Sequence, residues 1–130
     1  MKRSKLISLG KLKKQMDKLC SQIVIKRDGC CVMCAKTTNL NAHHAIVRKA
    51  QSLWTKWLPR NLVTLCWDCH FNYVHGQRAD YKWLKEYIYV VEKMIPLPIR
   101  SELEILASTK TNIKRVDLMG IYDNLQSINS

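Results

Sequence analysis

Two Cys-x-x-Cys pairs constrain the fold of this chain more than any other feature of its sequence. Cys31 and Cys34 form the first pair, and Cys66 and Cys69 form the second. Each pair turns two sulfur atoms toward one point, and two pairs supply the four soft ligands of a tetrahedral structural zinc ion. Disulfides or a redox Cys-x-x-Cys are the alternatives, but no thioredoxin-like, helix-opening context surrounds Cys31. We therefore predict a closed zinc site that holds the fold and performs no chemistry.

The other two cysteines are predicted to lie outside this site. Cys30 adjoins the first pair, but using it as a ligand would give a spacing of Cys-x-x-x-Cys, whereas Cys31 matches the spacing of the second pair. Cys20 falls beside an apolar stripe with helical spacing between residues 11 and 27. We expect Cys20 to be a small core residue.

Three histidines and one asparagine lie in the same stretch of chain as the two cysteine pairs. His43 and His44 stand between the two cysteine pairs, Asn61 precedes the second pair, and His70 follows it directly. In an extended segment adjacent side chains point to opposite faces, so His43 and His44 are expected to have different roles. A His-His pair alone is typical of one packed and one solvated side chain. The presence of Asn61 and His70 in the same zinc frame favours a catalytic interpretation.

Residues 40–46 and 61–70 resemble the two halves of an HNH endonuclease motif of the four-cysteine, zinc-stapled kind. That family has a ββα-metal unit, in which a two-stranded hairpin packs on a helix with a divalent ion between them. The resemblance implies an α+β fold with flanking helices, and it assigns one role to each polar residue. His43 is expected to bind the catalytic ion, His44 to act as general base, Asn61 to pin the loop that carries His44, and His70 to be a second ligand.

His75 resembles the optional third ligand of the family, but its spacing leaves that role open. One α-helical turn after His70 ends at position 74, where the sequence has Val74. The spacing of five residues therefore argues against His75 as a ligand if the segment is an α-helix.

The resemblance implies hydrolysis of phosphodiester bonds to 5′-phosphate and 3′-hydroxyl ends. A neutral imidazole is an effective base at neutral pH, so His44 is expected to take the proton of the attacking water. Mg²⁺ or Mn²⁺ bound by His43 and His70 would act as Lewis acid and template. Imidazole also suits softer ions, so Ni²⁺ or Zn²⁺ are expected to bind in vitro.

A narrower resemblance covers residues 12–76. Residues 16–27, the Arg-Asp-Gly before the first cysteine pair, residues 44–48 and residues 56–61 are similar to phage recombination nucleases of the NinG type. This resemblance implies a phage-encoded protein that acts on recombining or branched DNA in the cytoplasm of a bacterial host. The sequence does not determine whether one strand or both are cleaved. It also does not determine whether the protein is a monomer or a homodimer.

The charge balance indicates the class of partner. A formal net charge of +12, from 22 Lys and Arg against 10 Asp and Glu, points to a polyanion, most simply DNA. The basic residues that we expect to contact phosphates are Arg48, Lys49, Lys56 and Arg60. Trp54 and Trp57 lie among them and could be core residues or stack on bases. The first residues contain too short an apolar run for a signal peptide, and no run approaches about 20 apolar residues, so we expect a cytoplasmic protein without a membrane partner.

We divide the chain into four segments. Residues 1–28 are a basic arm over residues 1–14 (with Lys2, Arg3, Lys5, Lys11, Lys13 and Lys14) that leads into a helix, 29–76 the zinc-stapled core, 77–98 a packing helix, and 99–130 a helical extension without assigned chemistry. Ser101 and Glu104 suggest a capping box at the start of a short helix in that extension. The competing functional class is a zinc-stabilised nucleic-acid-binding protein without catalysis, which would need neither His44 nor Asn61.

Overall fold

The fold is built around a two-stranded antiparallel hairpin. The computed structural model describes residues 7–110 and 112–129, so residues 1–6 of the predicted basic arm lie outside the described residues, whereas Lys11, Lys13 and Lys14 belong to the first helix. Strand β1 (Leu40–His44) pairs with β2 (Leu62–Cys66), and His44 stands opposite Leu62. Every residue of β2 is buried, because helices cover both faces of the strand. This arrangement of helices and one small sheet is an α+β fold.

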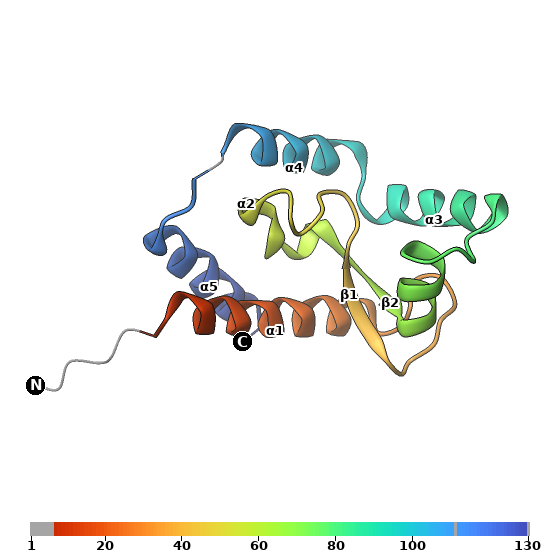
Figure 1. The fold of residues 1–130 in the computed structure, drawn as a ribbon, viewed down its shortest axis with the longest axis horizontal. Helices are drawn as coiled ribbons and strands as arrows, with labels where there is room; N and C mark the ends of the chain where they lie inside the picture. Colours follow the sequence, from red (N-terminus) through yellow and green to blue (C-terminus); the bar gives the residue numbers. More distant parts are fainter. Residues whose placement is uncertain (1–6, 111, 130) are drawn as a thin grey trace, which may run out of the picture.

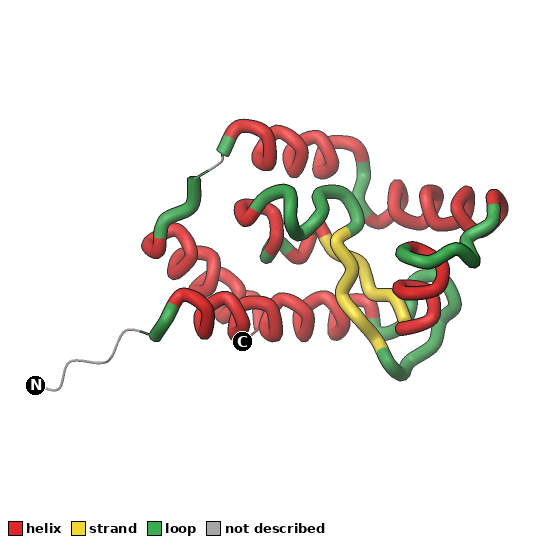
Figure 2. The backbone as a smooth tube through the Cα atoms, in the orientation of Figure 1, coloured by secondary structure: helices red, strands yellow, loops and turns green. Residues whose placement is uncertain are grey.

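Within residues 7–110 and 112–129, seven helical segments surround the hairpin. They are α1 (Leu9–Asp28), α2 (Leu53–Lys56), the 3₁₀ turn η1 (Pro59–Asn61), the π-helix η2 (Asp68–Val74), α3 (Tyr81–Met94), α4 (Leu97–Thr109) and α5 (Arg115–Asn129). The hairpin and α2 lie between α1 on one side and α3 with α4 on the other (Figure 1). The two strands cross the middle of the molecule, and the remaining regular structure is helical (Figure 2). No helix in the described ranges is long and apolar enough to cross a membrane.

The apolar stripe of α1 forms the core on one side of the hairpin. Leu12 and Met16 are fully buried and Cys20 is 2% exposed, which confirms Cys20 as a core residue. They pack with Trp57 and Leu62 and with two leucines of α5, Leu118 and Leu125. Burial of each large side chain contributes roughly 2 kcal/mol, so the contact between α1 and α5 is a substantial part of the core.

The opposite side of the hairpin has a second core. Val63 of β2 packs with Val47, with Val91 and Ile95 of α3, and with Leu103 of α4. The C-terminal extension therefore folds back on both sides of the core, α4 on one side and α5 on the other. The sequence left this arrangement open, because apolar periodicity shows that a helix has a buried face but not which element covers that face.

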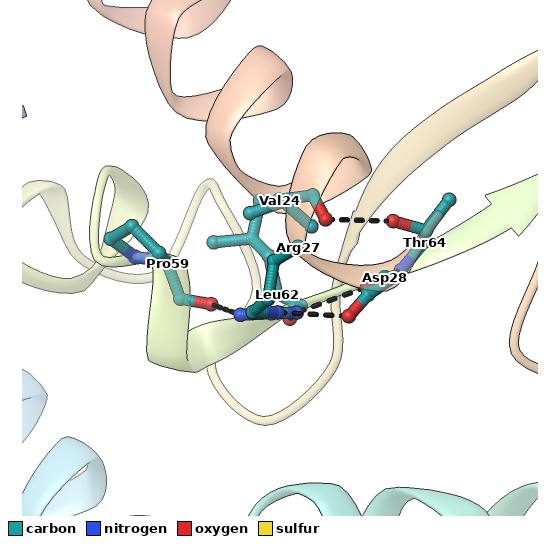
Figure 3. A network of polar contacts seen from close by, with 6 residues as sticks. All are labelled: Val24, Arg27, Asp28, Pro59, Leu62 and Thr64. Atoms are coloured by element: carbon teal, nitrogen blue, oxygen red, sulfur yellow. Dashed lines mark hydrogen bonds and ion pairs between the residues drawn. The ribbon is translucent and has the colours of Figure 1, made fainter. Parts of the chain in front are cut away.

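A polar network fastens the end of α1 to β2 (Figure 3). The guanidinium of Arg27 donates to the carbonyl oxygens of Pro59 at 2.8 Å and Leu62 at 2.7 Å, and it also pairs with Asp28. The Asp28 carboxylate accepts the backbone N–H of Thr64 at 2.9 Å, and its side chain is 4% exposed. These bonds cover the edge of β2 that faces away from β1 and fix the angle at which α1 meets the hairpin.

The predicted capping box in the extension is wrong. Helix α4 begins at Leu97 with Pro96 as the N-cap residue, so Ser101 and Glu104 both lie inside the helix. Pro98 is accommodated because the first turn of a helix has no intrahelical partner for its N–H groups. The helix therefore starts one turn earlier than the Ser-x-x-Glu pattern indicated.

Candidate metal and catalytic site

The four cysteines of the two Cys-x-x-Cys pairs come together. The sulfur atoms of Cys31, Cys34, Cys66 and Cys69 all lie within 4.8 Å of one another, and none of these residues forms a disulfide. Four sulfurs at the Zn–S distance of a tetrahedral site would be roughly 3.8 Å apart, so the group needs little adjustment to hold an ion. Cys30 is outside the group, as the register of the first pair predicted. We call these four residues the cysteine cluster.

The chemistry of the cysteine cluster suits a metal ion. Burial opposes ionisation of the Cys31 thiol, but hydrogen bonds from the backbone of Cys66, Cys34 and Met33 outweigh it and lower its pKa to about 7. Burial and a hydrogen bond with Cys66 raise the pKa of Cys69. Several thiolates this close repel one another unless a cation balances their charge. The cluster can therefore hold a metal ion such as zinc.

Three histidines form a second group. Nitrogen atoms of His43, His70 and His75 lie within 4.8 Å of one another, and the Nε2 atoms of His70 and His75 are 3.1 Å apart. His43 comes from β1, whereas His70 lies in η2 and His75 directly follows it. We call this group the three-histidine cluster.

The π-helical form of η2 explains why His75 joins the group. The backbone N–H of His75 donates to the carbonyl oxygen of His70 at 3.1 Å, a bond that spans five residues. In such a turn a side chain five positions on, not four, stands near the first. The objection to the spacing of His75 assumed an α-helix and is wrong for this segment. Gly76 follows, and a Cβ there would lie 2.5 Å from the carbonyl oxygen of Asn72, so glycine permits this tight exit.

The imidazoles of His43 and His70 are in the form that binds metals. Burial, and then the charges of His70, His75 and His44, lower the pKa of His43 to about 3. Burial is also the largest cause for His70, whose pKa falls to about 4. Neutral imidazole is the ligand form, so these rings are competent to bind an ion at neutral pH.

The surroundings of two ring nitrogens bear on how an ion would be held. Nε2 of His43 shares a hydrogen bond of 2.9 Å with the hydroxyl of Tyr87 on α3. Nδ1 of His70 is buried and has no hydrogen-bond partner among the described residues. A buried nitrogen without a protein partner fits a site for an ion or water. Three nitrogen donors suit Mn²⁺, Ni²⁺ or Zn²⁺ better than Mg²⁺, which prefers oxygen ligands.

His44 has the geometry of a general base. Its Nε2 is 2.9 Å from the backbone carbonyl oxygen of Lys56. A carbonyl only accepts, so Nε2 carries the proton and Nδ1 has the free lone pair. Burial lowers the pKa of His44 and keeps the ring neutral. His44 and the three-histidine cluster line one groove of about 620 Å³, which we call the histidine groove.

Asn61 is buried in the loop that follows β1. Its Nδ2 donates to the carbonyl oxygens of Val47 at 2.9 Å and Thr55 at 3.2 Å, and its Oδ1 accepts the N–H of Val47 at 2.9 Å. Its own carbonyl oxygen accepts the N–H of Ala45 at 2.8 Å. The side chain thus holds together both ends of the segment next to His44, which fits the role that the family resemblance implied.

The predicted phosphate-binding residues separate into two groups. Arg48, Lys49 and Lys56 line the histidine groove. Arg60 does not line it and instead pairs with Glu102 of α4 at 2.7 Å. This ion pair joins residues far apart in sequence, so no local pattern could have revealed it.

The two tryptophans of this segment have packing roles. Trp57 is 1% exposed, and its indole N–H donates to the Asp17 carboxylate at 2.7 Å. The indole N–H of Trp54 donates to the carbonyl oxygen of Asn112 at 3.1 Å. The interpretation as core residues therefore holds for Trp57, while Trp54 ties the segment to the chain before α5.

Sequence reasoning did not identify several residues at the site. Neither Tyr87, which contacts His43, nor Asp17, which lines the histidine groove, was singled out from the sequence as a site residue. Phe71 also lines this groove, beside the exposed ring of Trp67. Helical periodicity marks which face of a helix is buried but not which distant side chain it meets.

Comparisons with protein-family models, with curated proteins and with solved structures find no match for this chain.

Proposed function

We propose that this chain is a metal-dependent HNH DNA endonuclease or nickase. The observation that carries the proposal is the pairing of His44 with the three-histidine cluster along one groove. A neutral imidazole whose Nε2 is committed to the Lys56 carbonyl has a single nitrogen, Nδ1, left for a substrate water. A binding protein has no use for this arrangement.

The side chains divide the work of hydrolysis. Arg48, Lys49 and Lys56 hold the phosphates of the strand in the groove. Nδ1 of His44 takes one proton from a water, whose oxygen attacks phosphorus, and the bond to the 3′ oxygen breaks. The leaving 3′ oxygen takes a proton from solvent water, which leaves 5′-phosphate and 3′-hydroxyl ends. Asn61 is a positioning residue, because it holds the loop whose Lys56 carbonyl orients His44.

His43, His70 and His75 are the residues that would hold the catalytic ion. When bound, Mg²⁺, Mn²⁺ or a softer divalent ion supplies Lewis-acid stabilisation of the phosphate and of the leaving oxygen. The cysteine cluster would hold Zn²⁺ as a structural ion with no open position. The narrower resemblance adds phage DNA recombination in a bacterial cytoplasm as the setting.

Cleavage of supercoiled plasmid with Mn²⁺ or Mg²⁺ tests the proposal. Loss of a general base costs about 100-fold or more, so His44→Ala should slow cleavage by at least that factor. Asn41→Ala is the matched control, because it removes another polar side chain of the groove and should retain the rate within a few-fold. Nicks made by the wild type should be sealed by a DNA ligase that requires 5′-phosphate and 3′-hydroxyl ends.

The competing class is a zinc-stabilised nucleic-acid-binding protein. The net charge of +12 and the cysteine cluster favour it as much as they favour a nuclease. Binding of DNA without cleavage by the wild type, across Mn²⁺, Mg²⁺ and Ni²⁺, would replace the nuclease by this alternative. Equal cleavage by wild type and His44→Ala would remove His44 from the proposed role.

A further inference from the structure

Two aromatic side chains beside the three-histidine cluster face solvent. Trp67 is 52% exposed and Phe71 is 45% exposed, and their ring centroids are 5.4 Å apart. The Phe71 ring is also 4.7 Å from that of His70, and Phe71 lines the histidine groove. We call Trp67 and Phe71 the aromatic pair. It forms an apolar surface that continues directly from the proposed catalytic ligands.

The pair contributes to none of the buried clusters among the described residues. Other aromatic residues nearby are packed, since Trp83 stacks between Tyr73 at 5.1 Å and Tyr87 at 5.4 Å. Exposure of two adjacent rings leaves apolar surface in water without a benefit to the core. A contiguous exposed apolar surface of this kind marks a binding site.

The backbone beneath the pair is held in place. Trp67 lies between two members of the cysteine cluster, its N–H donates to the carbonyl oxygen of Asn39 at 2.8 Å, and the N–H of Cys69 contacts the Cys66 sulfur at 3.4 Å. The rings therefore project from a rigid base, and a ligand that stacks on them orders little of the chain.

The surroundings determine which ligand fits. Arg48 and Lys49 line the same groove as Phe71, and the chain carries a net charge of +12. A ligand that meets both features has a polyanionic backbone and flat apolar rings, which describes a nucleic acid strand. Bases inside an intact duplex are already stacked and present only their edges, so their faces are available only where bases are unpaired.

We infer that the aromatic pair stacks on unpaired bases of the strand held in the histidine groove. This inference rests on the proposed function and narrows its substrate to DNA with single-stranded regions, such as flaps, junction branches or frayed ends. Trp67 and Phe71 are then specificity residues that contact bases, while Arg48 and Lys49 contact phosphates.

Binding measurements separate this inference from catalysis. Fluorescent single-stranded DNA and a duplex of the same sequence are titrated at one fixed salt concentration with the zinc-loaded His44→Ala chain, without added Mn²⁺ or Mg²⁺. Removing one stacked ring costs about 5- to 100-fold in affinity. Adding Trp67→Ala or Phe71→Ala should therefore weaken single-strand binding by roughly 10-fold and duplex binding by less than about two-fold. Adding Trp67→Tyr, which keeps a ring, should retain most of the affinity.

Tyr89→Ala in the same background is the matched control. Tyr89 is 58% exposed on α3 and does not line the histidine groove, so its loss should change neither affinity. A 2-aminopurine base in the single strand reports stacking directly. Its fluorescence should be quenched on binding, and this quenching should be lost with Trp67→Ala or Phe71→Ala. Loss of zinc identifies a variant that has lost the fold. If one of Trp67→Ala and Phe71→Ala loses zinc, the binding measured with the other one tests the inference.

The outcomes are distinct from those for the nuclease. Equal loss of affinity for single-stranded and duplex DNA, or no loss of affinity in either variant, would overturn the aromatic inference even if the wild type cuts plasmid. Selective weakening on the single strand would support it even if the wild type never cuts, in which case only the catalytic proposal fails.

Discussion

At the scale of single residues, the buried side chain of Asn61 makes three hydrogen bonds to the backbone. Its amide satisfies three backbone groups, two from Val47 and one from Thr55, inside a segment from which water is excluded. The family resemblance pointed to this asparagine, but the identity of its partners came only from the folded chain. An unpaired buried polar group costs about 1–3 kcal/mol, so the three bonds matter for stability as well as for the position of His44.

Asn61→Ala should therefore lower the free energy of unfolding by roughly 3 kcal/mol, because it leaves three buried backbone groups without partners. Urea unfolding measures the change. Asn41→Ala is the control, since the Asn41 amide makes one exposed contact of 3.4 Å and its loss should cost less than about 0.5 kcal/mol. An equal loss of unfolding free energy in the two variants would mean that Asn61 does not hold the loop.

The proposed role of His44 as general base predicts how cleavage should depend on pH. A general base must be neutral, and burial lowers the pKa of His44 below its ordinary value of 6.5. A lower pKa keeps the ring neutral at more acidic pH, so the single-turnover rate at saturating Mn²⁺ should fall to half its maximum at a pH below 6.5. A midpoint at or above 6.5 would show that a different group titrates.

At the scale of elements, the junction of α1 with β2 shows how a helix end fixes a hairpin. The sequence predicted that α1 would end near Asp28-Gly29, and Gly29 does cap it with a φ of 74°. The use of Arg27 and Asp28 to bind β2 was not predicted. Such bonds join residues more than thirty positions apart, which periodicity does not report.

Asp28→Ala should lower the free energy of unfolding by roughly 2–4 kcal/mol, since it removes the acceptor for the Thr64 N–H and the partner of the Arg27 guanidinium. Asp123→Ala makes the same chemical change at an exposed position of α5 and should cost less than about 0.5 kcal/mol. Urea unfolding of both proteins distinguishes a structural carboxylate from a general effect of removing negative charge from a basic chain.

At the scale of the whole molecule, the cysteine cluster joins the loop after α1 to the end of β2 and the start of η2. A metal ion there would hold together the elements that carry His43, His70 and His75. Folding of the histidine groove would then depend on this ion, which the proposed hydrolysis does not use.

Cys31→Ser should lose zinc, and its melting temperature should fall by more than about 10 °C, because structural zinc contributes several kcal/mol to folding. Cys30→Ser is the matched control, since Cys30 is the adjacent residue and lies outside the cluster. Zinc content by mass spectrometry and thermal melting follow both variants. Retention of zinc by Cys31→Ser with its loss in Cys30→Ser would reverse the assigned register.

The sequence by itself determined the features that depend on local spacing. These are the register of the two Cys-x-x-Cys pairs, the buried stripe of α1 and the burial of Cys20, each of which follows from which neighbours share a face or a turn. Only the tertiary structure decided the pairing of Arg60 with Glu102, the contact of Tyr87 with His43 and the folding of α4 and α5 over the core. These contacts join distant positions, and their energy comes from packing that no local pattern records. The position of His75 belongs to neither group, because it depends on a local π-helical turn that the spacing of the residues did not indicate.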